Sequence, residues 1–119
     1  MADNNWVNDL FQTIDKRDTD AFLGFLADDV FFRFGNAEPA HGKNNVGNVV
    51  SGFFNSIKGI QHDINETWSM DDKTVCHGFV TYTRLNDTSL TVPFAVILQT
   101  DKDKIREYLI YADVSQLYQ

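Results

Sequence analysis

The sequence has a single cysteine, Cys76, and only three histidines, and this scarcity excludes several kinds of site. One cysteine cannot form an internal disulfide or build a cysteine-based zinc site. The histidines, His41, His62 and His77, are not closely paired, so their spacing does not favour a metal site. The chain also lacks a phosphate-cradling glycine-rich loop and a G-x-S-x-G element, and we expect no cofactor.

Positive charge is also scarce. Ten Lys and Arg side chains stand against seventeen Asp and Glu side chains, which gives a net charge of −7. This balance disfavours a protein that binds nucleic-acid phosphates or an anionic membrane surface. No apolar run approaches the roughly 20 residues of a membrane-spanning helix, and the start "MADNNWVNDLF" lacks the basic region of a secretion signal. We therefore expect a cytoplasmic protein that binds neither nucleic acid nor membrane.

What the sequence does contain is enough apolar material for one core. Its 119 residues, 43% of them hydrophobic, fit a single domain over residues 1–119. Apolar side chains at helical spacing predict three helices, with a strand between the second and the third. The predicted elements are a helix over 6–14 capped by Asp3, Asn4 or Asn5, a short helix over 22–26 that ends at Ala27 or Asp28, a strand over 30–34, a loop over 35–42 and a helix over 46–57.

The second half of the chain changes to a period of two, which is typical of β-strands. Side chains alternate faces along a strand, so Ile60, His62, Ile64, Glu66 and Trp68 are expected to share one face. Three more strands are expected over residues 74–84, 90–100 and 105–114, joined by polar turns. Helices followed by an antiparallel meander predict an α+β domain.

The stretch "LTVPFAVIL", residues 90–98, is apolar at successive positions rather than at alternate ones. A sheet that helices cover on one side only should alternate apolar and polar side chains. We therefore expect a second copy of the chain to cover the other face, in a homodimer formed through the convex side of the sheet. Whichever of Phe94, Val96 or Leu98 faces outward would then lie in the dimer contact.

Three segments, "LADDVFFRFG", "EPAHGK" and "KIREYLIYAD", occur in this element order at the places expected for a known superfamily. The chain resembles the nuclear transport factor 2-like, or SnoaL-like, superfamily over nearly its whole length. The resemblance implies three N-terminal helices packed on a strongly curved antiparallel sheet, in a cone with an apolar cavity. Steroid isomerases, epoxide hydrolases, polyketide cyclases and non-catalytic binding proteins share this fold, so the fold does not name the function.

Two enzyme patterns of the superfamily have no counterpart here. The ketosteroid isomerase pattern places the family's general base at Arg33, its oxyanion-hole tyrosine at Leu10 and its protonated aspartate at Ala95. Leu10 and Ala95 can neither donate a hydrogen bond nor move a proton. The limonene-epoxide-hydrolase pattern falls on Ile110, Val80 and Tyr82, and its carboxylates are absent. The polyketide cyclases offer no secure counterpart either.

Arg33 stands alone within a run of phenylalanines, and two interpretations of it stay open. In the first, its guanidinium lines the cavity and prefers a weakly anionic ligand. In the second, it stacks on aromatic neighbours while its head group reaches water.

His62 is the candidate catalytic residue, because imidazole changes charge near neutral pH and can carry a proton. Three aromatic residues join Arg33 as candidate ligand-binding residues, since their polar tips can orient a ligand in an apolar pocket. They are Trp68, Tyr82 and Tyr108. The expected ligand is a small hydrophobic or weakly anionic organic molecule. Two hypotheses follow: an acid/base enzyme of cyclase, isomerase or hydratase type, or a non-catalytic ligand-binding or dimeric interaction module.

Overall fold

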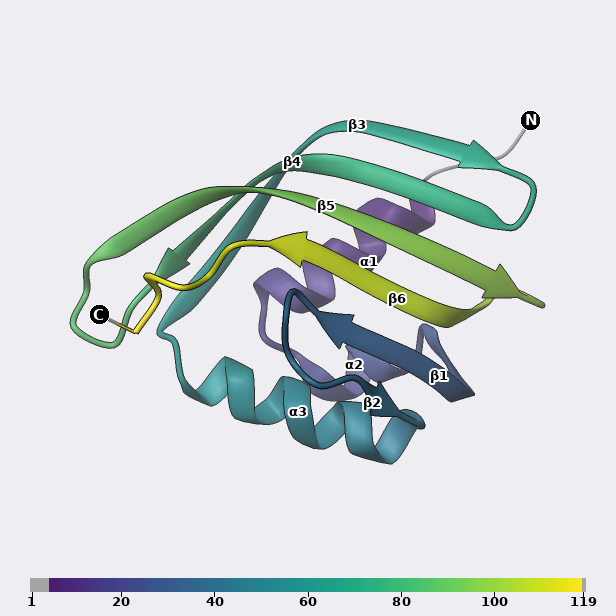
Figure 1. Cartoon of the computed structure of the whole chain (residues 1–119), viewed down its shortest axis with the longest axis horizontal. Helices are drawn as coiled ribbons and strands as arrows, with labels where there is room; N and C mark the ends of the chain where they lie inside the picture. The colour runs from purple at the N-terminus through teal and green to yellow at the C-terminus, as the bar shows by residue number, and fades with distance from the viewer. Residues whose placement is uncertain (1–4, 119) are drawn as a thin grey trace.

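The computed structural model describes residues 5–118, which fold as three helices packed on one curved sheet (Figure 1). The helices are α1 (Asn5–Asp15), α2 (Thr19–Leu23) and α3 (Lys43–Asn55). The strands are β1 (Leu26–Phe34), β2 (Ala40–His41), β3 (Gly59–Met70), β4 (Lys73–Thr83), β5 (Ser89–Asp101) and β6 (Lys104–Ala112). The expected α+β class and the expected element order are confirmed. Of the residues expected to cap the first helix, Asp3 and Asn4 lie outside the described residues.

The sheet is mixed, whereas the sequence predicted an antiparallel one. Its strand order is β2-β1-β6-β5-β4-β3, and the meander β3 to β6 is antiparallel as expected. Strand β1 runs parallel to β6, with Phe32 opposite Tyr108 and Phe34 opposite Ile110. Parallel neighbours need a long connection, and α3 with β3, β4 and β5 provides it here. The predicted loop after β1 contains the short strand β2, which pairs with β1.

Helix α2 ends before the predicted position. The Asp18 side chain accepts a hydrogen bond from the Ala21 amide at 3.1 Å and so caps the start of the helix. The helix stops at Leu23 with Gly24 as its C-cap, and not at Ala27 or Asp28. The reason is that Leu26, which the helical pattern included, pairs with Ile105 of β6. Helical spacing alone could not show this competition for the same side chain.

A β-bulge divides β3 into two halves. The alternation of inward- and outward-facing side chains is reversed from one half to the other. The register shifts between Ile64 and Glu66, so that Ile64 pairs with Gly78 while Glu66 pairs with His77. An extra residue in one strand moves every later side chain to the other face. Trp68 therefore does not share a face with His62, and this part of the alternation prediction is wrong.

The concave face of the sheet and the apolar faces of the helices form the core. On β5, Phe94, Val96 and Leu98 are all buried in this core, so none of them faces outward as the dimer prediction required. Their neighbours Ala95 and Ile97 lie on the convex face instead, since side chains alternate along a strand.

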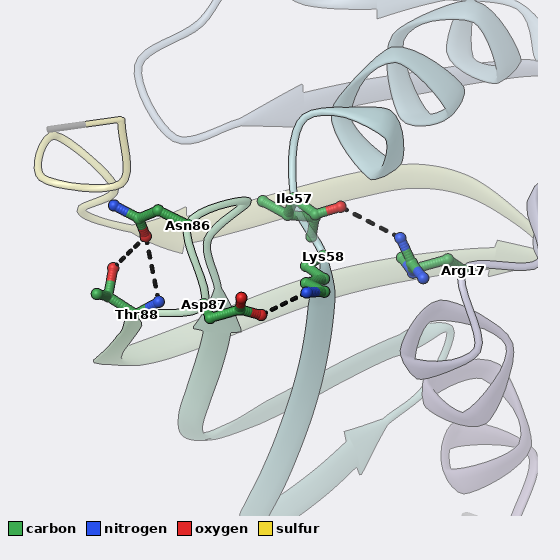
Figure 2. A network of polar contacts seen from close by, with 6 residues as sticks. All are labelled: Arg17, Ile57, Lys58, Asn86, Asp87 and Thr88. Carbon is green, nitrogen blue, oxygen red and sulfur yellow. Dashed lines mark hydrogen bonds and ion pairs between the residues drawn. The ribbon is translucent and has the colours of Figure 1, made fainter.

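The rim at one end of the cone is held by polar contacts (Figure 2). In the β4–β5 turn, the Asn86 side chain accepts hydrogen bonds from the amide and hydroxyl of Thr88. Asp87 of the same turn pairs with Lys58, the residue just before β3. Arg17 donates to the Ile57 carbonyl at 3.2 Å and so ties the end of α1 to the segment before β3. In Figure 1 the C-terminal segment lies beside the β4–β5 turn.

No helix within residues 5–118 is long and apolar enough to cross a membrane.

Candidate functional site

A cavity of about 50 Å³ lies between the concave face of the sheet and the helices. Its wall consists mostly of phenylalanine, valine and isoleucine side chains from α1, α2, α3 and five of the strands. The polar lining residues are His62, Tyr82 and Tyr108. This space holds only a few water molecules, at roughly 10–15 Å³ for each one. A ligand confined to the cavity must therefore be very small.

His62 on β3 is held by a carboxylate from α1. The Oδ1 atom of Asp15 lies 2.7 Å from Nδ1 of His62, and its Oδ2 atom accepts a hydrogen bond from the His62 amide at 3.2 Å. A carboxylate can only accept, so the proton of the neutral ring lies on Nδ1 and Nε2 is left with a lone pair. The rings of Phe11 and Phe94 flank the imidazole, with centroids 4.7 and 5.1 Å away.

The Nε2 atom of His62 has no hydrogen-bond partner within residues 5–118. Among the described residues, however, no fully buried side-chain nitrogen or oxygen lacks a partner. The atom must therefore touch accessible space, and the ring lines the cavity. A histidine on the wall of a largely apolar cavity, with its ring oriented by a carboxylate, is the arrangement expected of a general base held by a second group.

Asp15 is the residue that sequence reasoning missed. It ends α1, four positions along the helix from Phe11 and so on the same face. The sequence did contain a sign of this role: Asp15 is an acidic residue at a position where helical spacing continues the apolar face of α1. Its partner is 47 residues away, and only the packing of α1 against β3 brings the two together.

The hydroxyls of Tyr82 and Tyr108 also reach accessible space. Neither hydroxyl has a hydrogen-bond partner in the described part of the chain. Since no fully buried side-chain oxygen there lacks a partner, both hydroxyls must be accessible. Burial raises the pKa of both phenols above their ordinary value. Both groups therefore stay protonated at neutral pH and can donate a hydrogen bond to a ligand.

The strand register separates these polar groups along the cavity. His62 pairs with Val80, and Tyr82 is the next inward-facing residue on the same strand as Val80. Tyr82 contacts Phe53 of α3 near the rim, with ring centroids 5.9 Å apart. Tyr108 lies deeper, where its ring meets Phe22 and Phe32. His62 and Tyr82 therefore lie on neighbouring strands, one inward-facing position apart, while Tyr108 lies farther across the sheet on β6.

Arg33 and Trp68 lie outside the cavity. The Arg33 guanidinium donates to the Tyr111 hydroxyl at 3.0 Å and sits 5.6 Å from the centre of that ring, so the cavity-facing interpretation is corrected. The reason is the register of β1, in which Phe32 and Phe34 point inward. Trp68 is half exposed and stacks on His77 of β4, with ring centroids 5.4 Å apart.

The cavity wall also lacks the carboxylates that the limonene-epoxide-hydrolase pattern requires. Val80, Tyr82 and Ile110 do line the cavity, and none of them carries a carboxylate. Among the residues that the structure describes, no group of three or more histidine, cysteine, aspartate or glutamate side chains could hold a metal ion. Proton chemistry in the cavity is therefore limited to His62 and the two phenols.

Comparisons with known proteins agree with this architecture. The model of the SnoaL-like domain family matches residues 7–108. A search of curated protein sequences found no significant match.

Several solved structures share the fold at low sequence identity. An NTF2-like protein of unknown function from Burkholderia pseudomallei K96243 is 18% identical with a TM-score of 0.87, over 98% of this chain and 95% of that one. A protein of ketosteroid isomerase-like fold from Catenulispora acidiphila DSM 44928, in complex with trimethylamine, is 15% identical with a TM-score of 0.84, over 92% and 85%. An LEH-like epoxide hydrolase from M. tuberculosis is 12% identical with a TM-score of 0.79, over 94% and 83%.

At these identities the structures establish the fold alone, whereas the family model spans most of the chain. The chain belongs to the SnoaL-like domain family.

Proposed function

We propose that this protein binds a small, largely apolar organic molecule in its cavity and that His62 exchanges a proton with that molecule. The observation that carries the proposal is the Asp15–His62 pair at 2.7 Å, set in a wall that is otherwise apolar or phenolic. A carboxylate–imidazole pair costs desolvation in such a place, and a structural role alone does not require it to line a cavity.

The chemistry follows from the tautomer. Nε2 of the neutral ring can accept a proton from a bound molecule, and Asp15 then stabilises the imidazolium that forms. The Tyr82 hydroxyl can donate to an oxygen on which negative charge develops. Asp15 acts through His62 and is a positioning residue, while His62 and Tyr82 are the groups that would touch the ligand.

The ligand class follows from the lining. The apolar part of the expected ligand is supported by the phenylalanine-rich wall. The weakly anionic part depended on a cavity-facing Arg33, which the cavity does not have. We therefore propose that the buried part of the ligand is neutral. The trimethylamine bound by the relative from Catenulispora shows that a molecule of this small size suits a related fold.

The alternative is a non-catalytic ligand-binding module. It is favoured by the small volume of the cavity and by the lack of a carboxylate on its wall. In that case His62 and Tyr82 would orient a ligand by hydrogen bonds without proton transfer.

A generic probe of proton abstraction separates the two functions. When a base removes the carbon-bound proton of the five-membered ring of 5-nitrobenzisoxazole, the N–O bond breaks and a coloured cyanophenolate is released. We expect turnover above that of free imidazole, by about 100-fold or more, and its loss in His62→Gln. Asp15→Asn should lower kcat, and the accompanying change in KM should be smaller. Binding without turnover supports the module. The probe is larger than the cavity, so the proposal is overturned if the probe neither binds nor reacts and the smaller molecule hexanol also fails to bind.

We also propose a homodimer through the convex face of the sheet. This face carries half-exposed Trp68, Phe79 and Tyr111 together with the outward-facing Ala95 and Ile97. A stable contact would bury on the order of 1,500 Å² in total. Sedimentation should show a dimer at micromolar concentration and a monomer for Ile97→Asp, and a monomeric wild type would overturn the dimer. A cytoplasmic location is part of the same proposal and rests on the single cysteine.

A further inference from the structure

A groove lies beside the cavity at the rim. It shares Phe34, Val49, Phe53 and Ala112 with the cavity wall, so the two spaces are adjacent. Its outer part is formed by the end of β6 and by the C-terminal segment, residues 113–118. We call this space the mouth groove. Because the cavity itself has only about 50 Å³, most of a larger ligand would have to lie in the mouth groove.

The outer wall of the mouth groove is fixed in place. Arg84 at the end of β4 donates to the carbonyls of Leu117 and Gln116, each at 3.0 Å. The Leu117 side chain is buried, and the hydroxyls of Tyr118 and Ser56 lie 2.7 Å apart. The C-terminal segment is therefore attached both to β4 and to the end of α3. A wall held in this way provides a preformed surface for a ligand.

The chemistry of the mouth groove differs from that of the cavity. Aromatic rings from β1, α3, β6 and the C-terminal segment line it, those of Phe34, Phe53, Tyr111 and Tyr118, and one carboxylate, Asp113, joins them. The amide and hydroxyl of Ser115 hold the pKa of Asp113 below its ordinary value, so this carboxylate is charged at neutral pH. No lysine, arginine or histidine side chain lines the mouth groove within the described residues.

Two cations lie beside the mouth groove, and both are engaged: Arg84 by the C-terminal carbonyls and Arg33 by Tyr111. Arg33 donates to the hydroxyl of Tyr111 and lies over its ring, on the convex side of the sheet. Phe34, Phe53 and Tyr118 supply aromatic surface to the groove, and Asp113 supplies negative charge. Aromatic faces beside a carboxylate attract alkylammonium groups, because a ring face carries a negative quadrupole potential. A carboxylate-bearing ligand would be repelled by Asp113 and by the net charge of −7.

We propose that the mouth groove is a subsite for the alkylammonium end of an elongated ligand whose neutral, apolar end enters the cavity. This inference rests on the proposed ligand-binding function and adds the charge and the shape of the ligand. The occupant is a small amphiphilic amine, with a short hydrocarbon chain and a positively charged nitrogen.

Three probes with the same six-carbon chain test the subsite by calorimetry and by NMR titration. They are hexyltrimethylammonium, hexanol and hexanoate. In the wild type we expect hexyltrimethylammonium to bind about tenfold more tightly than hexanol, and hexanoate to bind most weakly. Asp113→Asn should lower the affinity for hexyltrimethylammonium about fivefold and leave hexanol unchanged.

The matched control is Asp103→Asn, which removes the same charge in the turn at the opposite end of β6. This variant should bind all three probes as the wild type does. Equal affinities for hexyltrimethylammonium and hexanol, or equal effects of the two substitutions, would overturn the subsite while leaving the cavity function standing. If none of the three probes binds, both the subsite and the proposed function are overturned.

Discussion

Asp15 at the end of α1 holds His62 of β3 by two contacts, from one carboxylate oxygen to Nδ1 at 2.7 Å and from the other to the backbone amide at 3.2 Å. The ring is therefore fixed both in position and in tautomer. Only 10% of the His62 side chain is exposed, so little solvent competes for the contact.

Replacing Asp15 with asparagine tests this control of the tautomer. The side-chain amide that the substitution introduces could either donate to Nδ1 or accept from it, so the preference for a proton on Nδ1 should fall. Nitrogen NMR of the imidazole should show Nδ1–H dominant in the neutral ring of the wild type and mixed tautomers in D15N. We expect D15N to lose about 1–2 kcal/mol of stability. Asp9→Asn, on the exposed side of the same helix, should change neither quantity.

Gly78 allows the β-bulge that divides β3. A Cβ atom at this position would lie 1.9 Å from the Asp63 carbonyl oxygen, and backbone cannot move away as a flexible side chain can. We expect Gly78→Ala to cost at least about 2–3 kcal/mol in denaturant unfolding. Gly52→Ala in α3, where a Cβ meets nothing within 4 Å, should instead stabilise by roughly 0.5–1 kcal/mol. Equal effects of the two substitutions would contradict the role of Gly78 in allowing the bulge.

The same bulge marks the limit of what the sequence could predict. The structure places Tyr82 and Tyr108 on the inner face with Val80 and Ile110, which is consistent with regular alternation along β4 and β6. Alternation failed for Trp68, because one extra residue in β3 reverses the facing of everything after it. A glycine inside the paired strand was the available sign of this irregularity.

Other parts of the site could not follow from local patterns. The contact between Asp15 and His62 depends on how a helix packs on a strand far away in the chain. The facing of Arg33 depends on the pairing of β1 with β6, which no periodicity within β1 reveals. Assignment of a role to His62, Tyr82 and Tyr108 stays a prediction, and the structure places all three on the cavity wall.

Alkaline pH should weaken the fold through the buried thiol of Cys76. Burial raises the pKa of this thiol to about 12, whereas in the unfolded chain it titrates near 9. Between these values the unfolded state releases a proton that the folded state keeps, so stability falls as pH rises, by up to about 1.4 kcal/mol per pH unit. Urea unfolding between pH 8 and pH 10 should show a smaller fall for Cys76→Ala. An identical pH dependence in the two proteins would contradict this explanation.

Arg84 should control the order of the C-terminal segment. It donates to two carbonyls of that segment and also to the Thr88 hydroxyl and the Ser89 carbonyl. Removing these donors in Arg84→Met should cost about 1–3 kcal/mol and speed hydrogen exchange at the Leu117 amide. Arg106→Met, whose side chain is half exposed and makes only 4.0 Å ion pairs, should change stability by no more than about 0.5 kcal/mol. Unchanged exchange at Leu117 in R84M would show that other contacts hold the segment.

Arg33→Met should have little effect on ligand binding. The guanidinium is bonded to an exposed tyrosine on the convex face and does not reach the cavity. We expect a change in stability of no more than about 0.5 kcal/mol and the same affinity for neutral probes as in the wild type. If calorimetry showed a tenfold loss of affinity for these probes in Arg33→Met, Arg33 would belong to the ligand site.

The proposed binding of a small apolar molecule beside His62 can be checked by an NMR titration with hexanol. We expect saturable shifts of the His62 imidazole signals and of the methyl groups of Val80 and Ile110, which line the cavity. The methyl groups of Ile97 on the convex face should not move. Shifts confined to the convex face, or no saturable shift at His62, would contradict the proposed binding.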